Sequence, residues 1–257
     1  MSYATGYAVQ NEAGTEIAEI GTTPRTGRLY GIGVGPGDPE LLTVKALRLL
    51  QAAPVVAYPV SDGGKSLSRS IVAGYLRPDQ IEVPLWYPFK LEQSSQPYYD
   101  QAADQLAEHL QAGQDVVVLC EGDPFFYGTF MYLFNRLSGQ FNTEVVPGVS
   151  SVMANAAVLG TPLTYRNDVF MVLPGTLPAE ILAERLATAD AAIILKLGHN
   201  FAKVYGVLQR LGLLERAHYI ERATMPNQRI VPIQEVDPDT VPYFALISVP
   251  SQWQPSA

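Results

Sequence analysis

The stretch Gly33-Val34-Gly35-Pro36-Gly37-Asp38-Pro39 decides the fold of this chain. It follows the apolar residues 29–34, which predict a buried strand, and precedes residues 40–53, whose apolar positions predict an amphipathic helix. Glycines permit positive φ and let a ligand approach the main chain closely. Asp38 is placed to cap the helix. The same residues would also suit a tight strand-to-helix turn that binds no ligand.

The glycine-rich stretch matches neither of the standard phosphate-binding motifs. The dinucleotide-binding motif G-x-G-x-x-G fails in both registers, because its sixth position falls on Pro36 or on Asp38. The P-loop motif G-x-x-x-x-G-K-[ST] ends acceptably at Gly64-Lys65-Ser66, but its first glycine would be Pro59. The sequence therefore predicts a backbone platform of another kind.

The composition is that of a globular protein. The 257 residues are 47% hydrophobic and 16% charged, which allows a sizeable core and argues against wholesale disorder. The single cysteine, Cys120, permits no intrachain disulfide, as is typical of a reducing compartment. No apolar run reaches the roughly 18–20 residues that span a bilayer, and no secretory signal is evident. We expect a soluble, cytoplasmic protein that does not enter a membrane.

The charge and the histidine pattern exclude several functions. A formal net charge of −8 disfavours binding to nucleic acid, and an anionic ligand would need Arg and Lys concentrated at its site. His109, His199 and His218 are scattered, and no Cys or His spacing resembles a metal site. No serine lies in the G-x-S-x-G elbow of a hydrolase. We expect no metal and no nucleic-acid partner.

Strands and helices alternate along the chain from residue 28 onward. Strands that are apolar throughout, alternating with helices, are typical of a mainly parallel sheet covered on both faces. The pattern restarts after residues 160–164, and its last three strand-like segments have no long helix between them. Residues 85–97, with three aromatics and two prolines, predict a loop that forms a lid or wall. The predicted strands are residues 29–34, 55–58, 81–83, 115–120, 143–146, 169–173, 191–195, 219–220, 229–233 and 243–249, and the predicted helices are residues 40–53, 67–76, 98–112, 127–137, 149–159, 179–187 and 201–211.

This pattern predicts an α/β protein with two domains. A mainly parallel sheet is expected in an N-terminal domain over residues 27–162, and a mixed sheet in a C-terminal domain over residues 163–257. Residues 1–26 are polar and aperiodic, and we expect them to form a flexible extension.

A second cluster of candidate ligand contacts, residues 121–128, follows an apolar strand. Open α/β sheets place their ligands at this end of the strands. Gly122 allows close approach, and Asp123 would either hold the turn or accept a hydrogen bond from a ligand hydroxyl. Phe126 and Tyr127 would form apolar walls of a site, or would pack in the core.

Two more clusters occur later in the chain. Residues 146–151 bring Ser150 and Ser151 to the start of a predicted helix, where they would cap the helix or contact a ligand. Residues 161–166 place Arg166 at the predicted domain junction. An arginine there would bind a ligand carboxylate or form an interdomain ion pair.

In their order, these clusters resemble the tetrapyrrole (corrin/porphyrin) methylase family. The resemblance covers residues 28–250 and rests on GVGPGDPELLT, EGDPFFYGT, VVPGVSS and GTPLTYR. It implies a two-domain α/β fold, a homodimer, and the methyl donor S-adenosyl-L-methionine bound in the trough between the domains. S-adenosyl-L-homocysteine would be the product.

Within the family the chain is most similar to the branch that methylates C-20 of precorrin-2 in cobalamin biosynthesis. This similarity rests on Tyr58-Pro59 and on residues 64–67, 196–200 and 221–228. The uroporphyrinogen-methylating branch has an acidic residue where this chain has Pro59, which argues against that branch and removes its proposed base.

The resemblance also assigns site residues by motif. The donor contacts that it implies, many of them through backbone atoms, are Pro36, Glu121, Gly122, Asp123, Phe126, Ser150, Ser151, Leu197, Ala223 and Ala245. The substrate carries several carboxylates, so an acidic protein must meet it with local cations. The cations in or beside the motif loops are Lys65, Arg69, Arg166 and Lys196.

The implied chemistry is an in-line displacement at a sulfonium methyl group. An apolar, water-poor pocket suits this reaction, and positioning supplies much of its rate. The acceptor would be an enamine-like meso carbon, so a strong base is not obligatory, and we assign no catalytic residue. Methylation at another position of a related tetrapyrrole and a tetrapyrrole-binding protein without catalysis stay open as alternatives. The sequence does not decide between a metal-free and a cobalt-bound substrate.

Overall fold

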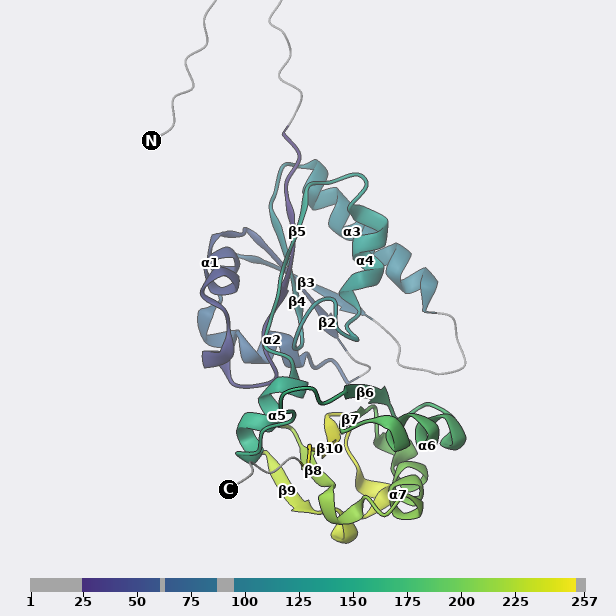
Figure 1. The fold of residues 1–257 in the computed structure, drawn as a ribbon. Coiled ribbons are helices and arrows are strands. Elements are labelled where there is room, and N and C mark those ends of the chain that lie inside the picture. The colour runs from purple at the N-terminus through teal and green to yellow at the C-terminus, as the bar shows by residue number, and fades with distance from the viewer. Residues whose placement is uncertain (1–24, 61–62, 87–94, 253–257) are drawn as a thin grey trace, which may run out of the picture.

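The computed structural model describes residues 25–60, 63–86 and 95–252 (Figure 1). The predicted extension over residues 1–26 falls almost wholly outside these ranges, as does the central part of the predicted loop over residues 85–97. The described ends of that loop belong to regular structure, because β3 continues to Trp86 and α3 begins at Gln96.

The first sheet is parallel throughout, as the apolar strands predicted. Its strands lie in the order β3-β2-β4-β1-β5, and every neighbouring pair runs in the same direction. The strands are β1 (Leu29–Gly33), β2 (Val55–Val60), β3 (Ile81–Trp86), β4 (Val116–Cys120) and β5 (Thr143–Val146).

Helices cover both faces of this sheet. Figure 1 shows α1 (Val44–Ala52) and α2 (Leu67–Ile71) on one side, and α3 (Gln96–Gln111) and α4 (Phe130–Leu137) on the other. Alternate residues of β4 therefore enter different cores: Val116 and Val118 pack toward α3 and α4, whereas Val117 and Leu119 pack toward α1. A strand buried on both faces must be apolar at every position, which explains the sequence of β4.

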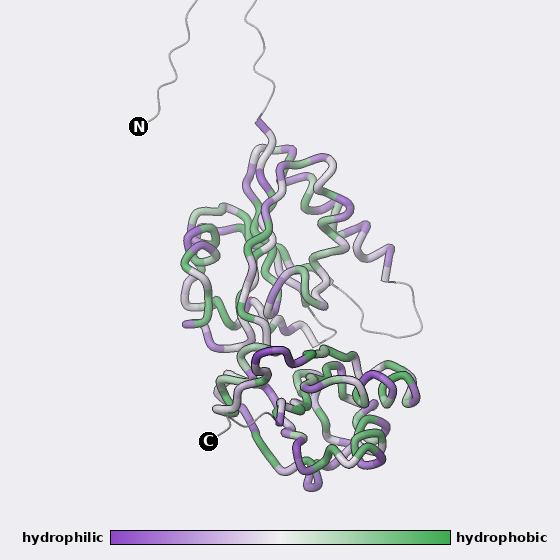
Figure 2. The backbone as a smooth tube through the Cα atoms, viewed as in Figure 1, coloured by the Kyte–Doolittle hydropathy of each residue, from purple (hydrophilic) through white to green (hydrophobic). Residues whose placement is uncertain are grey.

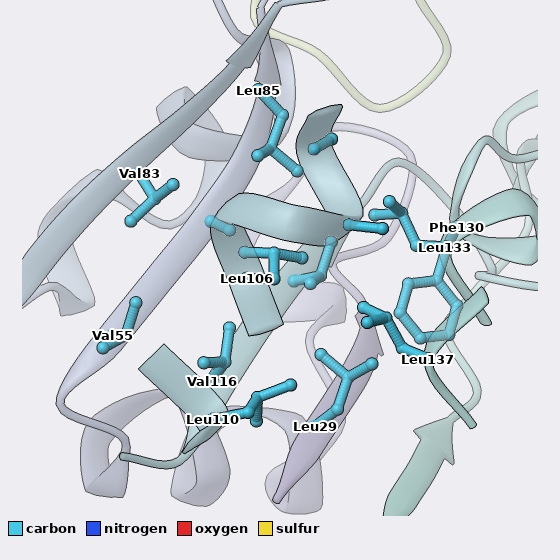
Figure 3. Packing of buried hydrophobic residues seen from close by; sticks show 14 of the residues in the cluster. Leu29, Val55, Val83, Leu85, Leu106, Leu110, Val116, Phe130, Leu133 and Leu137 are labelled. Carbon is cyan, nitrogen blue, oxygen red and sulfur yellow. The ribbon is translucent and has the colours of Figure 1, made fainter. Parts of the chain in front are cut away.

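The core on the α3 and α4 face is a mainly aliphatic cluster, with Phe130 at one side beside Leu133 and Leu137 (Figure 3). Leu106 and Leu110 of α3 are fully buried against the sheet, and Leu133 of α4 is 1% exposed. Leu106, Leu110 and Tyr99 are spaced four or seven residues apart, so one face of α3 meets the sheet. Figure 2 shows hydrophobic residues gathered along the strands of both sheets.

The second sheet is mixed, as predicted. Its order is β6-β7-β10-β8-β9; β6 and β7 are parallel, and the remaining neighbours are antiparallel. α6 (Ala179–Thr188) and α7 (Phe201–Arg210) supply the core on one face, and α5 (Ser151–Leu159) contributes to the core on the other. The strands are β6 (Phe170–Pro174), β7 (Ala191–Leu195), β8 (His218–Glu221), β9 (Arg229–Pro232) and β10 (Ala245–Val249). The predicted division at residues 162 and 163 stays a prediction.

Three predicted helix starts were too early. The helix expected from residue 149 begins at Ser151, because Ser150 is its N-cap. The helix expected from Glu40 begins at Val44, because Pro39–Leu41 forms a separate short 3-10 turn and Thr43 caps α1 by accepting a hydrogen bond from the amide of Ala46. Asp38 caps the 3-10 turn instead, through the amide of Glu40. The helix expected from residue 127 begins at Phe130, since Tyr127 has a φ of 55° and cannot belong to a right-handed helix.

Candidate active site between the two sheets

Three loops converge at the carboxyl edge of the first sheet. They follow β4, β1 and β5, which are neighbours in the sheet, so their C-terminal ends meet at one edge. The glycine-rich stretch follows β1, the Glu121–Asp123 segment follows β4, and residues 147–150 follow β5. Clusters that are far apart in the sequence are thereby placed together.

Backbone hydrogen bonds join the first two loops. The amide of Gly122 donates to the carbonyl of Gly35 at 2.9 Å, and the amide of Val34 donates to the carbonyl of Cys120 at 2.9 Å. Gly122 has a φ of 63°, a conformation that a residue with a side chain rarely adopts. The turn after β4 therefore requires this glycine.

Asp123 joins the second loop to the third. Its Oδ1 accepts a hydrogen bond from the amide of Phe125 at 2.9 Å, and its Oδ2 accepts one from the amide of Gly148 at 3.0 Å. Of the two roles considered for Asp123, the structure thus shows it holding the turn. Ser150 similarly caps α5, accepting a hydrogen bond from the amide of Val152 at 3.2 Å.

The loops pack so closely that two glycines are sterically required. A Cβ atom on Gly148 would lie 2.1 Å from the carbonyl oxygen of Gly122. A Cβ atom on Gly33 would lie 2.5 Å from the same oxygen. Real Cβ atoms do not approach this closely, so glycine serves loop-to-loop packing here.

The far end of the glycine-rich stretch touches the second half of the chain. The amide of Asp38 donates to Oγ1 of Thr224 at 3.1 Å, across 186 residues of sequence. A Cβ atom on Gly37 would lie 2.4 Å from Cγ of Met225. The stretch therefore connects the first sheet to the turn that follows β8.

A cavity of about 150 Å³ lies among these loops and the ends of β7, β8 and β10. Nine of the ten residues to which donor contacts were assigned line this cavity, and Leu197 alone does not. The nine are Pro36, Glu121, Gly122, Asp123, Phe126, Ser150, Ser151, Ala223 and Ala245. Leu197 is fully buried in the core on the α6 and α7 face. Its assignment stays a prediction.

Sequence reasoning left several lining residues unassigned. Arg222 and Phe244 directly precede Ala223 and Ala245, so extending each motif by one residue would have found them. Tyr127 was considered only as a wall residue. The other unassigned lining residues are Leu67, Leu195, Ile220, Met225, Tyr243 and Leu246.

Arg222 is held in the cavity wall by a buried carboxylate. Glu221 is 3% exposed and accepts hydrogen bonds from Arg222, from the hydroxyl of Tyr219 at 3.0 Å and from Arg229 at 3.2 Å. Arg222 also donates through Nε to the carbonyl of Asn227 at 3.1 Å. A charged pair with several hydrogen bonds fixes the direction of the guanidinium.

Glu121 and Asp123 are the two acidic residues that line the cavity. Oε1 of Glu121 accepts a hydrogen bond from the amide of Ser68 at 3.1 Å, and among the described residues Glu121 forms no ion pair. Burial raises the pKa of this carboxyl, and hydrogen bonds from its own backbone and from Ser68 offset only part of that effect.

The four cations assigned to the substrate have different surroundings. Lys196 lines the cavity, with Nζ 5.2 Å from the ring centroid of Tyr127. Arg69 forms a two-point ion pair with Glu82, at 2.8 Å for each hydrogen bond. Lys65 and Arg166 are exposed and lie outside the helices and strands. The structure places only Lys196 of the four in the cavity lining.

The described residues contain neither a membrane-spanning helix nor a cluster of metal-binding side chains. No described helix combines the length and the apolar character needed to cross a bilayer. The same part of the chain contains no group of three His, Cys, Asp or Glu side chains arranged to hold a metal ion.

Comparison with curated proteins identifies relatives along most of the chain. The cobalamin biosynthesis protein CobIJ of Mycobacterium tuberculosis (strain ATCC 25618 / H37Rv) is 46% identical over 233 residues, which cover 87% of this chain and 46% of that protein. The chain thus spans about half the length of this relative. The precorrin-2 C(20)-methyltransferase of Sinorhizobium sp is 43% identical over 233 residues, covering 87% of this chain and 95% of that protein.

The fold also matches a solved methyltransferase. The uroporphyrin-III C-methyl transferase from Thermus thermophilus, solved with S-adenyl homocysteine, superposes with a TM-score of 0.65 at 30% identity, covering 87% of this chain and 92% of that chain. The sequence model of the tetrapyrrole (corrin/porphyrin) methylases matches residues 28–237. On this evidence the chain belongs to the tetrapyrrole (corrin/porphyrin) methylase family.

Proposed function

We propose that this protein transfers a methyl group from S-adenosyl-L-methionine to C-20 of precorrin-2, or of its cobalt-bound form, in cobalamin biosynthesis. The observation that carries the proposal is the cavity between the two sheets, which nine residues assigned to the donor line together. Family membership supports the reaction type. The similarity to the Sinorhizobium precorrin-2 C(20)-methyltransferase, over nearly all of that protein, supports the acceptor.

The residues present fit the donor in chemical character. The glycine-rich loops offer backbone groups, and Phe126 and Phe244 offer flat apolar surfaces for an adenine. When bound, the donor supplies an electrophilic methyl group. The chain's own part is to hold the reactants in line and to exclude water from the cavity.

We also propose that Lys65, Arg69, Arg166 and Lys196 bind the substrate carboxylates. Lys196 is the best supported of the four, because it lines the cavity and makes no ion pair within the described ranges. Arg69 would have to share its guanidinium with Glu82 or release it. The division into domains at residues 162 and 163, a homodimeric state and a cytoplasmic location complete the proposal.

Substituting Lys196→Ala should weaken substrate binding by about tenfold, the equivalent of roughly 1.4 kcal/mol, while the affinity for S-adenosyl-L-homocysteine changes little. Fluorescence titration with the tetrapyrrole and calorimetric titration with the product would measure the two affinities. Lys203→Ala is the matched control, because Lys203 lies on α7 and donates to the carbonyl of Leu177, away from the cavity lining. An unchanged tetrapyrrole affinity in Lys196→Ala would remove this residue from the substrate site.

Direct assay tests the activity itself. The purified protein would be incubated with the donor and precorrin-2, and separately with the donor and cobalt-precorrin-2, and the products analysed by mass spectrometry and NMR. We expect a mass gain of one methyl group, located at C-20. Methylation at another carbon would change the proposed position, and tetrapyrrole binding without any mass gain would indicate a binding protein instead of an enzyme.

A further inference from the structure

The acceptor carbon that the proposed function names must lose a proton. A meso carbon carries one hydrogen, and methyl transfer forms a carbon–carbon bond there while the carbon–sulfur bond of the donor breaks, leaving its electron pair on sulfur. The methylated carbon then holds both a hydrogen and a methyl group, and the ring carries the positive charge. Conjugation is restored when that hydrogen leaves as a proton and its bonding pair returns to the π system.

The described lining of the cavity contains few groups able to accept this proton. Asp123 already accepts one backbone hydrogen bond on each of its two oxygens. Lys196 and Arg222 are cations. Burial, followed by the negative charge of Glu121, raises the pKa of Tyr243, so that its hydroxyl stays protonated at neutral pH.

Glu121 differs from each of these groups. It lies at the carboxyl end of β4, the central strand of the first sheet. Its side chain accepts a hydrogen bond from the amide of Ser68 on α2. Within the described ranges it has no cationic partner. A carboxylate that lines a cavity without an ion pair is available for proton transfer.

We propose that the carboxylate of Glu121 accepts the proton released by the methylated carbon. Glu121 becomes a neutral carboxylic acid in this step, and the substrate regains its conjugated system, so atoms and charges balance. This inference rests on the proposed function and assigns the proton acceptor that the sequence left open. Any contact of Glu121 with the donor would then be made through its backbone.

The surroundings of Glu121 define the expected pH dependence. Cys120 precedes Glu121 at the end of β4, and the titratable or charged groups that share the cavity lining with Glu121 are Asp123, Tyr127, Lys196, Arg222 and Tyr243. Burial favours the neutral form of the carboxyl, so the ionised acceptor is formed only above its raised pKa. The turnover rate should rise with pH through this single ionisation.

Glu121→Gln is the decisive variant, since its amide oxygen can still accept the hydrogen bond from the amide of Ser68. We expect a kcat about 100-fold lower and a pH profile without the rising limb, with the affinity for S-adenosyl-L-homocysteine within about threefold of the original. Glu121→Asp should recover part of the rate. Glu184→Gln, on the exposed side of α6, is the matched control and should behave like the unmodified protein.

A second measurement does not depend on methyl transfer. The protein would be incubated in D₂O with S-adenosyl-L-homocysteine and precorrin-2. The Glu121 carboxyl should then catalyse exchange of the meso hydrogen of precorrin-2 for deuterium. The variant Glu121→Gln should lose this exchange. An unchanged kcat and an unchanged pH profile in Glu121→Gln would overturn the inference. So would a variant whose only change is an affinity for S-adenosyl-L-homocysteine at least tenfold weaker. If the unmodified protein methylates no tetrapyrrole, it is the proposed function that fails.

Discussion

At the scale of single residues, Glu121 should make the fold less stable at neutral pH. Its pKa is raised in the folded protein, so the stability that its proton contributes at low pH is lost as pH rises through the folded pKa. Glu121→Gln removes this loss and should raise the urea midpoint at pH 7.5, whereas the two proteins should converge below about pH 4. A variant less stable than the original at pH 7.5 would contradict the assigned pKa direction.

Unlike Glu121, Asp123 should stabilise the fold, because its carboxylate accepts hydrogen bonds from two backbone amides. In Asp123→Asn, one of the two backbone amides would face an amide nitrogen instead of an oxygen, so we expect a loss of about 1–3 kcal/mol in the free energy of unfolding. Urea denaturation would measure it. The control is Asp239→Asn, at an exposed position, where a change within about 0.5 kcal/mol is expected. Equal effects at both sites would show that Asp123 does not hold the loops together.

At the scale of elements, the packing of the loops after β1, β4 and β5 depends on glycine. Gly148→Ala would place a Cβ atom 2.1 Å from the backbone oxygen of Gly122, which cannot be relieved by a side-chain rotation. We expect a loss of about 1–3 kcal/mol in stability together with weaker binding of S-adenosyl-L-homocysteine. Gly139→Ala, with open space around its Cβ position, should change neither by a measurable amount. Tolerance of alanine at Gly148 would disprove the close loop contact.

At the scale of the whole molecule, the contact between Asp38 and Thr224 should matter for binding, because it connects both sides of the cavity. Thr224→Val keeps the side-chain shape but removes the acceptor for the amide of Asp38. A net loss of about 1 kcal/mol corresponds to roughly fivefold weaker product binding in a calorimetric titration. Thr188→Val at the end of α6 is the control. Identical affinities in the two variants would show that this contact does not shape the cavity.

The sequence by itself determined the layered architecture. Apolar strands such as β4 can be stable only when both of their faces are covered, and helical spacing identified the covering helices, so element type and sheet class follow from local pattern. Helix starts were less certain, because they depend on single backbone conformations such as the positive φ of Tyr127. The order of the clusters along the chain was enough to indicate the family and part of the cavity lining.

Only the tertiary structure decided how those clusters meet. Strand order brings the loops after β4, β1 and β5 to one edge, and the contact between Asp38 and Thr224 spans 186 residues. No local pattern encodes such distances, since they result from the packing of two sheets and the turns between them. The same packing buried Leu197, turned Arg222 into the cavity wall and left Glu121 without a cationic partner among the described residues, because burial and ion pairing depend on neighbours that are remote in sequence.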